Sequence, residues 1–182
     1  MSTGTAVINR LIPWVLPATE ADWDALFVEQ LPRVYNYFRY RVGDGPVAED
    51  LTSATFEKAW QARGRYRRDL AAFSTWLFAI ARNVATDHFR RRRSHAPIEA
   101  AEHIPGGATP EEEHERRADL ERLAGLLSGL PDRESDLIAL KYGAGLTNRA
   151  IARYLGLTES NVGTILHRTI QALRAGWKEG DS

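Results

Sequence analysis

The stretch from Leu146 to Arg168, LTNRAIARYLGLTESNVGTILHR, contains two short helical patterns that meet at Gly156. Apolar residues recur in it at the offsets that let two helices bury a shared seam. Thr147 and Thr158 stand where helix N-caps are expected, and Gly156 suits the left-handed conformation of a tight turn. This layout is typical of a helix-turn-helix, whose second helix lies in a DNA groove. On the pattern alone, an ordinary helical hairpin in a bundle remains an alternative.

The second helix of this pattern presents polar side chains on its outer side. They are hydrogen-bonding groups of the kind that contact base edges and phosphates in the major groove. The outward residues are Glu159, Ser160, Asn161, Thr164, His167 and Arg168. DNA is therefore the leading candidate partner.

The composition favours an all-α chain. Apolar residues make up 43% of the 182 residues, which is enough for one sizeable core or two small ones. Glycine and proline cluster at a few points, and no alternating apolar run is long enough to indicate a sheet. We expect two small helical domains joined by a flexible acidic linker, the second being a helix-turn-helix domain.

Several other classes of protein are disfavoured. The chain has no cysteine, which excludes disulfides and thiolate metal sites. No apolar stretch approaches a membrane span, and residues 1–20, interrupted by Pro13 and Pro17, are interpreted as a flexible arm rather than a secretory signal. The sequence has no Gly-rich phosphate loop, paired-histidine metal spacing or Gly-x-Ser-x-Gly elbow. We expect a cytoplasmic protein that is not an enzyme and has no cofactor, metal or membrane partner.

The formal net charge is zero, but the charges are segregated along the chain. Residues 57–93 hold ten basic and three acidic side chains, residues 98–121 hold two basic and eight acidic ones, and residues 141–174 hold five basic and one acidic. Two basic blocks are thus separated by an acidic connector. Three prolines and a Gly-Gly pair fall within residues 96–112, which we interpret as the linker.

Three helical patterns precede the linker, over about 21–42, 46–62 and 73–93. Pro46 is expected in the first turn of its helix. The third pattern carries an apolar stripe, and we assign its Trp76 to the core. The loop before the third pattern carries several basic side chains and one aromatic ring, which we call the cationic rim. Such a combination is suited to binding single-stranded nucleic acid. Its basic and aromatic side chains are Arg63, Arg65, Tyr66, Arg67 and Arg68.

Three stretches follow one another in a characteristic order: AEDLTSATFEKAW (48–60), FSTWLFAIARNVATDHFRRRR (73–93) and LPDRESDLIALKYGAGLTNRAIARYLGLTESNVGTILHR (130–168). They resemble the extracytoplasmic-function sigma factors of bacterial RNA polymerase, over about residues 21–177. The resemblance implies a region 2-like domain over 21–95, for polymerase docking and for recognition and melting of the minus-ten element. It implies a region 4-like helix-turn-helix domain over 113–178 that binds the minus-thirty-five element.

In that family the helix that corresponds to residues 48–60 binds the polymerase clamp. The resemblance places Asp50, Ser53 and Glu57 at the polymerase-binding face. Phe56 and Trp60, four residues apart, are expected to pack inward. A solvated helix face remains the alternative for either acid considered alone.

The second stretch and the loop before it open the minus-ten element in that family and hold a base of the non-template strand. Melting requires a pocket for an everted base and cations for the phosphates, which a basic helix beside a basic loop supplies. Asn83 and Asp87 either orient each other, one turn apart, or Asp87 pairs with a neighbouring arginine. The implied minus-ten contacts are Arg65, Tyr66, Arg67, Arg68, Arg82, Asn83, Asp87, His88, Arg90, Arg91 and Arg93.

The third stretch would read the minus-thirty-five element as duplex DNA. Arg149 and Thr158 join the six outward residues of the second helix in this implied contact set. The acidic residues of the linker either imitate phosphates in the polymerase channels or form an extended tether.

The resemblance implies three partners: core RNA polymerase, promoter DNA as duplex and melted single strand, and an anti-sigma protein. Two rival functions remain, a stand-alone helix-turn-helix transcriptional regulator and a sigma-like decoy that sequesters a regulatory protein. The docking helix from Asp50 to Trp60 argues against the first rival. The cations Arg82, Arg90 to Arg93 and Arg168 argue against the second.

Overall fold

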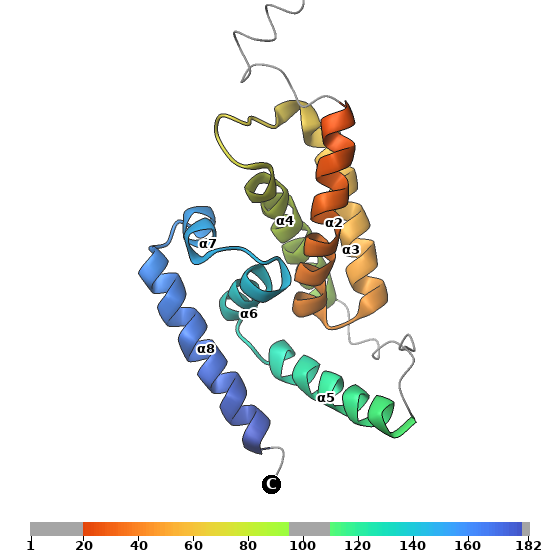
Figure 1. Ribbon diagram of the computed structural model, residues 1–182, viewed down its shortest axis with the longest axis vertical. Coiled ribbons are helices and arrows are strands. Elements are labelled where there is room, and N and C mark those ends of the chain that lie inside the picture. Colours follow the sequence, from red (N-terminus) through yellow and green to blue (C-terminus); the bar gives the residue numbers. More distant parts are fainter. Residues whose placement is uncertain (1–19, 95–109, 180–182) are drawn as a thin grey trace, which may run out of the picture.

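The computed structural model describes residues 20–94 and 110–179. These residues form helices and turns without a β-strand, which confirms the expected all-α class (Figure 1). The elements are α2 (Glu20–Val42), α3 (Gly45–Ala62), the 3₁₀ turn η1 (Arg63–Arg65), α4 (Phe73–Ser94), α5 (Pro110–Ser128), α6 (Asp132–Ile138), the π-helical turn η2 (Ala139–Gly143), α7 (Asn148–Leu155) and α8 (Glu159–Glu179).

The connection from α2 to α3 is fixed by local chemistry. Gly43 has a φ of 73°, a conformation that L side chains rarely adopt. The side chain of Asp44 accepts a hydrogen bond of 2.9 Å from the N–H of Val47 and so caps α3. Pro46 lies in the first turn, as predicted, where its missing N–H leaves no helical hydrogen bond unmade.

Aromatic rings hold α2, α3 and α4 together. The ring of Trp23, on α2, lies edge-on to those of Phe73 and Trp76 on α4, at centroid distances of 5.4 and 6.3 Å. Phe27 of α2 packs on Phe56 of α3 at 4.4 Å. Such tilted and edge-to-face pairs add to the stabilisation that burial provides. Trp76 is half-buried against this core, in agreement with its assignment to the core.

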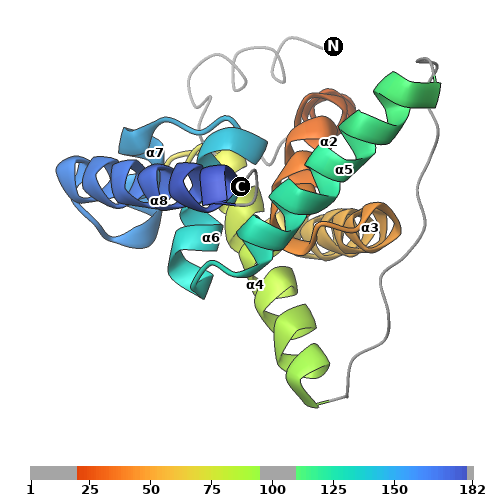
Figure 2. The ribbon, with the colours of Figure 1, turned by 90° about the horizontal axis from the view of Figure 1, so that it is seen from below.

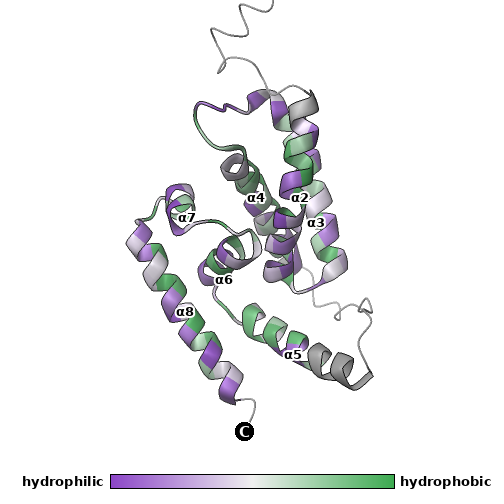
Figure 3. Ribbon diagram, in the orientation of Figure 1, coloured by the Kyte–Doolittle hydropathy of each residue, from purple (hydrophilic) through white to green (hydrophobic). Residues whose placement is uncertain are grey.

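The helix-turn-helix comprises α7, α8 and the turn between them. Thr147 and Thr158 each accept a hydrogen bond of 3.1 Å from the backbone N–H three residues ahead. Gly156 ends α7 with a φ of 66°, and Ile151 and Val162 are fully buried in the seam between the two helices. The predicted caps, turn and seam are therefore confirmed. Polar and apolar residues alternate along α8 (Figure 3), as expected of a helix with one buried side.

Helices α5 and α8 pack on each other beside α6 (Figure 2). The guanidinium of Arg122, on α5, lies 4.5 Å from the ring centre of Trp177 on α8. Helix α5 begins at Pro110, so the last residues of the predicted linker are helical. The rest of that linker, and nearly all of the predicted N-terminal arm, lie outside the described residues.

The two groups of helices pack against each other and share one hydrophobic core. Leu137 and Leu140, from α6 and η2, are fully buried in the same cluster as Val34 and Phe38 of α2. Helix α6 lies beside the lower parts of α2 and α4 in Figure 1. The expectation of two small domains joined by a flexible linker did not include this packing. The packing brings together segments about a hundred residues apart in the sequence.

Candidate nucleic-acid interface

The outer face of the helix-turn-helix is polar and open to solvent. Nε of Arg149, on α7, lies 3.5 Å from Oε2 of Glu159 at the start of α8, so these two side chains are positioned together. All eight residues that the sequence assigned to duplex DNA are exposed: Arg149, Thr158, Glu159, Ser160, Asn161, Thr164, His167 and Arg168. The outer side of the helix-turn-helix therefore presents hydrogen-bond donors and acceptors, the kinds of group that contact base edges in a major groove.

A second polar face lies on α3. Asp50, Ser53 and Glu57 are exposed and recur at the three- and four-residue spacing that aligns side chains along a helix. Glu57 accepts a hydrogen bond of 3.2 Å from Nε2 of Gln61, one turn farther along. The structure therefore brings the three residues assigned to polymerase binding onto one face.

Trp60 departs from its expected position. Its partner in the predicted pair, Phe56, is buried, but Trp60 is 39% exposed. The ring centres of Trp60 and Trp23 are 5.5 Å apart. The guanidinium of Arg63 lies 3.8 Å from the ring centre of Trp60. The prediction that Trp60 packs inward is thus only half right, because an arginine rather than the core covers part of the ring.

The loop between η1 and α4 does not present a free stacking ring. Tyr66 packs against Phe73 and Trp76 at centroid distances of 5.4 and 5.2 Å, and its hydroxyl donates to the carbonyl of Ala71 at 3.3 Å. Burial raises the pKa of the Tyr66 hydroxyl, with Arg68 opposing the shift. The cationic rim is as predicted, but the tyrosine anchors the loop to the core.

Arg67 in the same loop is paired within it. Its Nε and Nη2 donate to the two carboxylate oxygens of Asp69 at 3.0 and 2.8 Å. The hydrogen bonds and charge of Arg67 hold the pKa of the Asp69 carboxyl below its usual range. Arg65 and Arg68 are exposed on the same loop. The ion pair between Arg67 and Asp69 therefore fixes the orientation of one guanidinium in the cationic rim.

Along α4, Asp87 is paired with two cations. Its Oδ1 lies 3.1 Å from Nη2 of Arg90, one turn ahead, and its Oδ2 lies 3.8 Å from Nζ of Lys58 on α3. Of the two alternatives left open by the sequence, Asp87 therefore takes the pairing with an arginine. Asn83 is exposed on the same helix.

His88 is half-buried and packs its ring on Phe89 at a centroid distance of 5.4 Å. Burial lowers the pKa of His88, and the nearby charges of Arg92 and Arg91 lower it further. Its imidazole is therefore neutral at physiological pH. Arg90 and Arg91 are exposed beyond it, and the side chain of Arg93 lies outside the described residues.

The residues assigned to the minus-ten element are spread along α4 rather than gathered in one pocket. The basic loop precedes the first residue of this 22-residue helix, and the arginine run lies in its last turns. At 1.5 Å per residue the two ends are about 30 Å apart. The set forms a strip that suits an extended strand.

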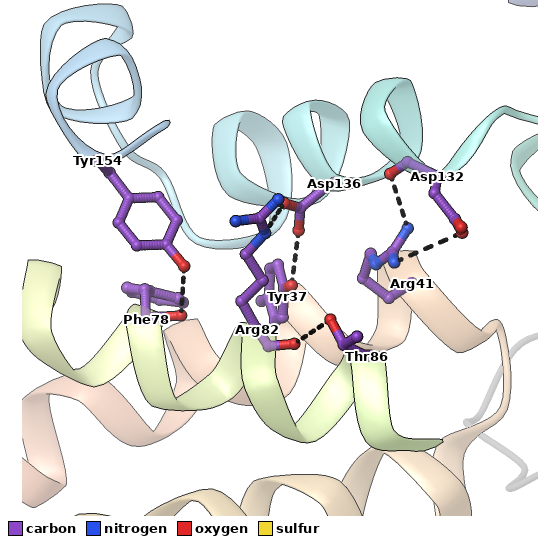
Figure 4. Close-up of polar contacts among 8 residues, drawn as sticks. All are labelled: Tyr37, Arg41, Phe78, Arg82, Thr86, Asp132, Asp136 and Tyr154. Carbon is purple, nitrogen blue, oxygen red and sulfur yellow. Dashed lines mark hydrogen bonds and ion pairs between the residues drawn. The ribbon is translucent and has the colours of Figure 1, made fainter. Parts of the chain in front are cut away.

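The structure also reveals a polar cluster that sequence reasoning missed. Oδ1 of Asp136, on α6, accepts a hydrogen bond of 2.7 Å from the hydroxyl of Tyr37, and Oδ2 lies 2.9 Å from Nε of Arg82 on α4 (Figure 4). Asp136 is only 4% exposed. The one signal in the sequence was an acid directly before an apolar run, which alone does not identify its partners.

A cleft of about 760 Å³ opens beside this cluster, between the two groups of helices. It is lined by Arg41 at the end of α2, by Arg82 and Phe89 of α4, and by Leu155 and Leu157 at the turn of the helix-turn-helix. The guanidinium of Arg41 lies over the ring of Phe89, 4.8 Å from its centre. The two groups of helices therefore meet through a polar cluster and an incompletely filled cleft.

Within the described residues, no group of three or more His, Cys, Asp or Glu side chains has the proximity needed to hold a metal ion. Over the same part of the chain, no helix is long and apolar enough to cross a membrane.

Two protein families match the chain: Sigma-70 region 2 over residues 26–95, and Sigma-70, region 4 over residues 126–175. The chain is 30% identical over 160 residues to the ECF RNA polymerase sigma factor BldN of Streptomyces coelicolor, covering 86% of this chain and 61% of that protein. It is 30% identical over 159 residues to the ECF RNA polymerase sigma factor SigL of Mycobacterium tuberculosis, covering 85% of this chain and 88% of that protein. The chain thus spans less than two thirds of the first relative and most of the second.

Two solved structures share the fold. CnrH, in complex with the cytosolic domain of CnrY, superposes with a TM-score of 0.67 at 23% identity, over 90% of this chain and 92% of CnrH. The sigma factor RpoE, in complex with the anti-sigma factor NepR from Bartonella quintana, gives a TM-score of 0.67 at 19% identity, over 86% of this chain and 97% of RpoE.

Proposed function

The chain belongs to the ECF RNA polymerase sigma factors, which are transcription initiation factors rather than catalysts, and we propose that it directs core RNA polymerase to specific promoters. In this proposal it recognises and melts the minus-ten element and binds the minus-thirty-five element. The observation that carries the proposal is the presence on one chain of both matched regions, each with its own exposed polar face.

The proposed polymerase contact is the face of α3 formed by Asp50, Ser53 and Glu57. Their exposure and common direction support this assignment, because a docking surface must be accessible along its whole length. Two carboxylates on that face suit a basic surface of the polymerase.

The proposed minus-ten contacts are the loop that precedes α4 and the exposed side of α4 itself. In this proposal the arginines of the loop and of the last turns hold the phosphates of the melted strand, and Asn83 contacts a base. Tyr66 supports the loop from the core side instead of stacking on a base.

The proposed minus-thirty-five contact is the outer face of α8 together with Arg149. Thr158 caps the helix, so in this proposal its hydroxyl sets the position of the N-terminal turn that faces the DNA. Arg168 and Thr164 lie farther along the same face and reach the adjacent phosphates and base edges.

In this proposal residues 21–95 bind polymerase and the minus-ten element, and residues 113–178 bind the minus-thirty-five element. An anti-sigma protein is the proposed regulator. Support comes from the similar fold of RpoE, which was solved in complex with the anti-sigma factor NepR. The cytoplasm is the proposed compartment, since core polymerase acts there.

Run-off transcription with bacterial core polymerase on a promoter library tests the proposal. We expect promoter-specific starts that require the chain, and the sequenced transcripts should identify both promoter elements. Replacing Arg90 and Arg91 by glutamate should lower transcript yield roughly tenfold or more, because two phosphate contacts become repulsive. The matched control replaces Arg174 and Lys178, exposed basic residues at the far end of α8, by glutamate and should leave the yield nearly unchanged.

Absence of starts, with core polymerase shown to be competent by another sigma factor, would contradict the proposal. Binding to polymerase without initiation would then indicate a decoy, and binding to duplex DNA without polymerase would indicate a stand-alone regulator. Equal losses in both charge-reversal variants would show a non-specific charge effect and contradict the assignment of the arginine run.

A further inference from the structure

The cleft between the two groups of helices carries more positive than negative charge. Its charged lining consists of four arginines and two aspartates, so its formal net charge is +2. The guanidinium group matches phosphate well, because its planar N–H donors form parallel hydrogen bonds to two phosphate oxygens. The cleft therefore suits a phosphoryl group. The charged lining residues are Arg41, Arg82, Arg90, Arg133, Asp132 and Asp136.

Arg41 is a buried cation whose charge is weakly compensated. Its side chain is only 7% exposed, and its Nη2 lies 4.0 Å from Oδ1 of Asp132. Its Nη1 donates to the backbone carbonyl of Asp132 at 3.3 Å, and its Nε has no hydrogen-bond partner within residues 20–94 and 110–179. A buried charge with such long contacts is unfavourable. A phosphoryl oxygen beside this guanidinium would supply the compensating charge.

The negative charge of Asp136 is compensated inside the protein. Its Oδ1 accepts a hydrogen bond of 2.7 Å from Tyr37, and its Oδ2 lies 2.9 Å from Nε of Arg82. Figure 4 shows Arg41 and Arg82 reaching toward α6 from α2 and α4. The side chain of Arg82 is 51% exposed, so part of its guanidinium is accessible to a ligand.

One side of the cleft is apolar. Phe89, Leu155 and Leu157 line it and are half-buried against the core. The volume of about 760 Å³ lies within the range of about 300 to 1,000 Å³ that small-molecule sites occupy. An apolar wall beside several cations suits a ligand that joins a phosphoryl group to a flat organic ring. Inorganic phosphate alone would leave the apolar wall uncovered.

The width of the cleft is fixed, because a glycine sets how closely the two groups of helices approach. A Cβ at Gly143 would lie 2.8 Å from the carbonyl oxygen of Asn36 and 3.0 Å from Cα of Tyr37. Both are backbone atoms of α2, so no side-chain rotation relieves the overlap. The packing of η2 on α2 therefore depends on the absence of a side chain at this position, and it holds the lining residues of both groups in place.

We propose that this cleft is a binding site for a nucleoside phosphate. The phosphoryl groups bind the guanidiniums of Arg41, Arg82 and Arg133, and the base lies against Phe89 and the leucines of the turn. A regulatory consequence rests on the proposed function: Arg82 and Arg90 are proposed minus-ten contacts, so a bound nucleotide competes with the promoter strand for the same cations.

Calorimetric titration of the full chain tests the site, with ADP as the probe. We expect ADP to bind with a stoichiometry of about one, and about tenfold or more tighter than adenosine, inorganic phosphate or citrate. Adenosine has no phosphoryl group, phosphate has no ring, and citrate is an anion of another class. The gain reflects hydrogen bonds to charged groups together with apolar contact.

Arg133→Glu and Arg41→Met each remove one of the proposed phosphate contacts and should weaken ADP binding about tenfold or more. The matched control is Arg153→Glu, which reverses the charge of an exposed arginine on α7 outside the lining and should bind ADP like the parent chain. Circular dichroism identifies a variant that fails to fold, and the other variant then decides the result. ADP should also shift the methyl NMR signals of Leu155 and Leu157.

The proposal is wrong if ADP does not bind saturably, or if its binding leaves the signals of both leucines unshifted. Equal affinity for citrate would contradict the preference for phosphate, and equal affinity for inorganic phosphate would contradict the contact with a base. Equal losses in Arg133→Glu and Arg153→Glu would show a general charge effect and contradict the site.

Run-off transcription tests the regulatory consequence separately. ADP should lower the yield obtained with the parent chain but not the yield obtained with Arg133→Glu, and another sigma factor on the same polymerase controls for effects of ADP on the polymerase. Equal inhibition of both chains would contradict the competition. The titration contains neither polymerase nor DNA, so failure of the parent chain to initiate transcription contradicts the proposed function and not the nucleotide site.

Discussion

At the scale of single residues, one buried and one half-buried phenol where the helix groups meet make the structure sensitive to alkaline pH. Burial, and then the charge of Asp136, raises the pKa of Tyr37 well above its ordinary value. Burial and Asp136 likewise raise the pKa of Tyr154 to about 12, with Arg82 opposing the shift. Both hydroxyls donate hydrogen bonds, so both contacts require the protonated phenol.

The direction of the pH effect follows from linkage. The pKa of Tyr154 is higher in the folded chain than its unfolded value of 10.0, so its stabilising contribution is complete below pH 10. It is lost as the pH rises toward 12. We expect the unfolding temperature to fall over this interval, and to fall less steeply in Tyr154→Phe, which has no hydroxyl to titrate.

Thermal melts followed by circular dichroism, across pH 9 to 11.5, measure this difference. Tyr142→Phe is the matched control because that phenol is 50% exposed. Identical slopes in the parent chain and in Tyr154→Phe would contradict the assigned role of the Tyr154 hydroxyl.

At the scale of elements, the turn of the helix-turn-helix depends on one backbone conformation. Gly156 has a φ of 66°, and the left-handed region costs an L side chain about 1 kcal/mol. Gly156→Ala should therefore lower the free energy of unfolding by about 1 kcal/mol. Chemical denaturation measures it, with Gly125→Ala, inside α5, expected to be neutral or slightly stabilising. Equal effects of the two substitutions would contradict the argument.

The exposed face of α3 gives a prediction about binding. Replacing Asp50 and Glu57 by lysine should weaken the binding of core polymerase by roughly tenfold or more, since two favourable charges become repulsive. Asp24→Lys with Asp119→Lys makes the same charge change on exposed positions of α2 and α5. Fluorescence anisotropy with labelled chain measures both, and similar losses in the two variants would indicate a general charge effect instead of a docking face.

These elements were predictable because their determinants are local. The caps at Thr147 and Thr158, and the glycine turn at Gly156, each depend on residues within one helical turn. The positions of Tyr66 and Trp60 were less predictable because their determinants are not local. Their surroundings come from α2, α4 and a neighbouring arginine, which periodicity within one segment does not reveal.

At the scale of the whole molecule, the contact between the two groups of helices could not be derived from the sequence. The residues of the Tyr37 and Asp136 hydrogen bond are 99 positions apart, and the acidic linker between them indicated independent domains. Nothing local distinguishes Gly143 from any other glycine near a helix end. Its role appears only once the backbone of α2 lies against it.

The shared core has a consequence for how the molecule unfolds. Because Val34 and Phe38 of α2 lie in one buried cluster with Leu140 of η2, separation exposes apolar surface on both groups. We expect the free chain to unfold in one calorimetric transition whose van't Hoff and calorimetric enthalpies agree. Gly143→Ala should split or broaden that transition, since each group then unfolds on its own. Gly125→Ala should keep the single transition, and a single sharp transition in Gly143→Ala would show that the groups remain joined without the close approach of η2 to α2.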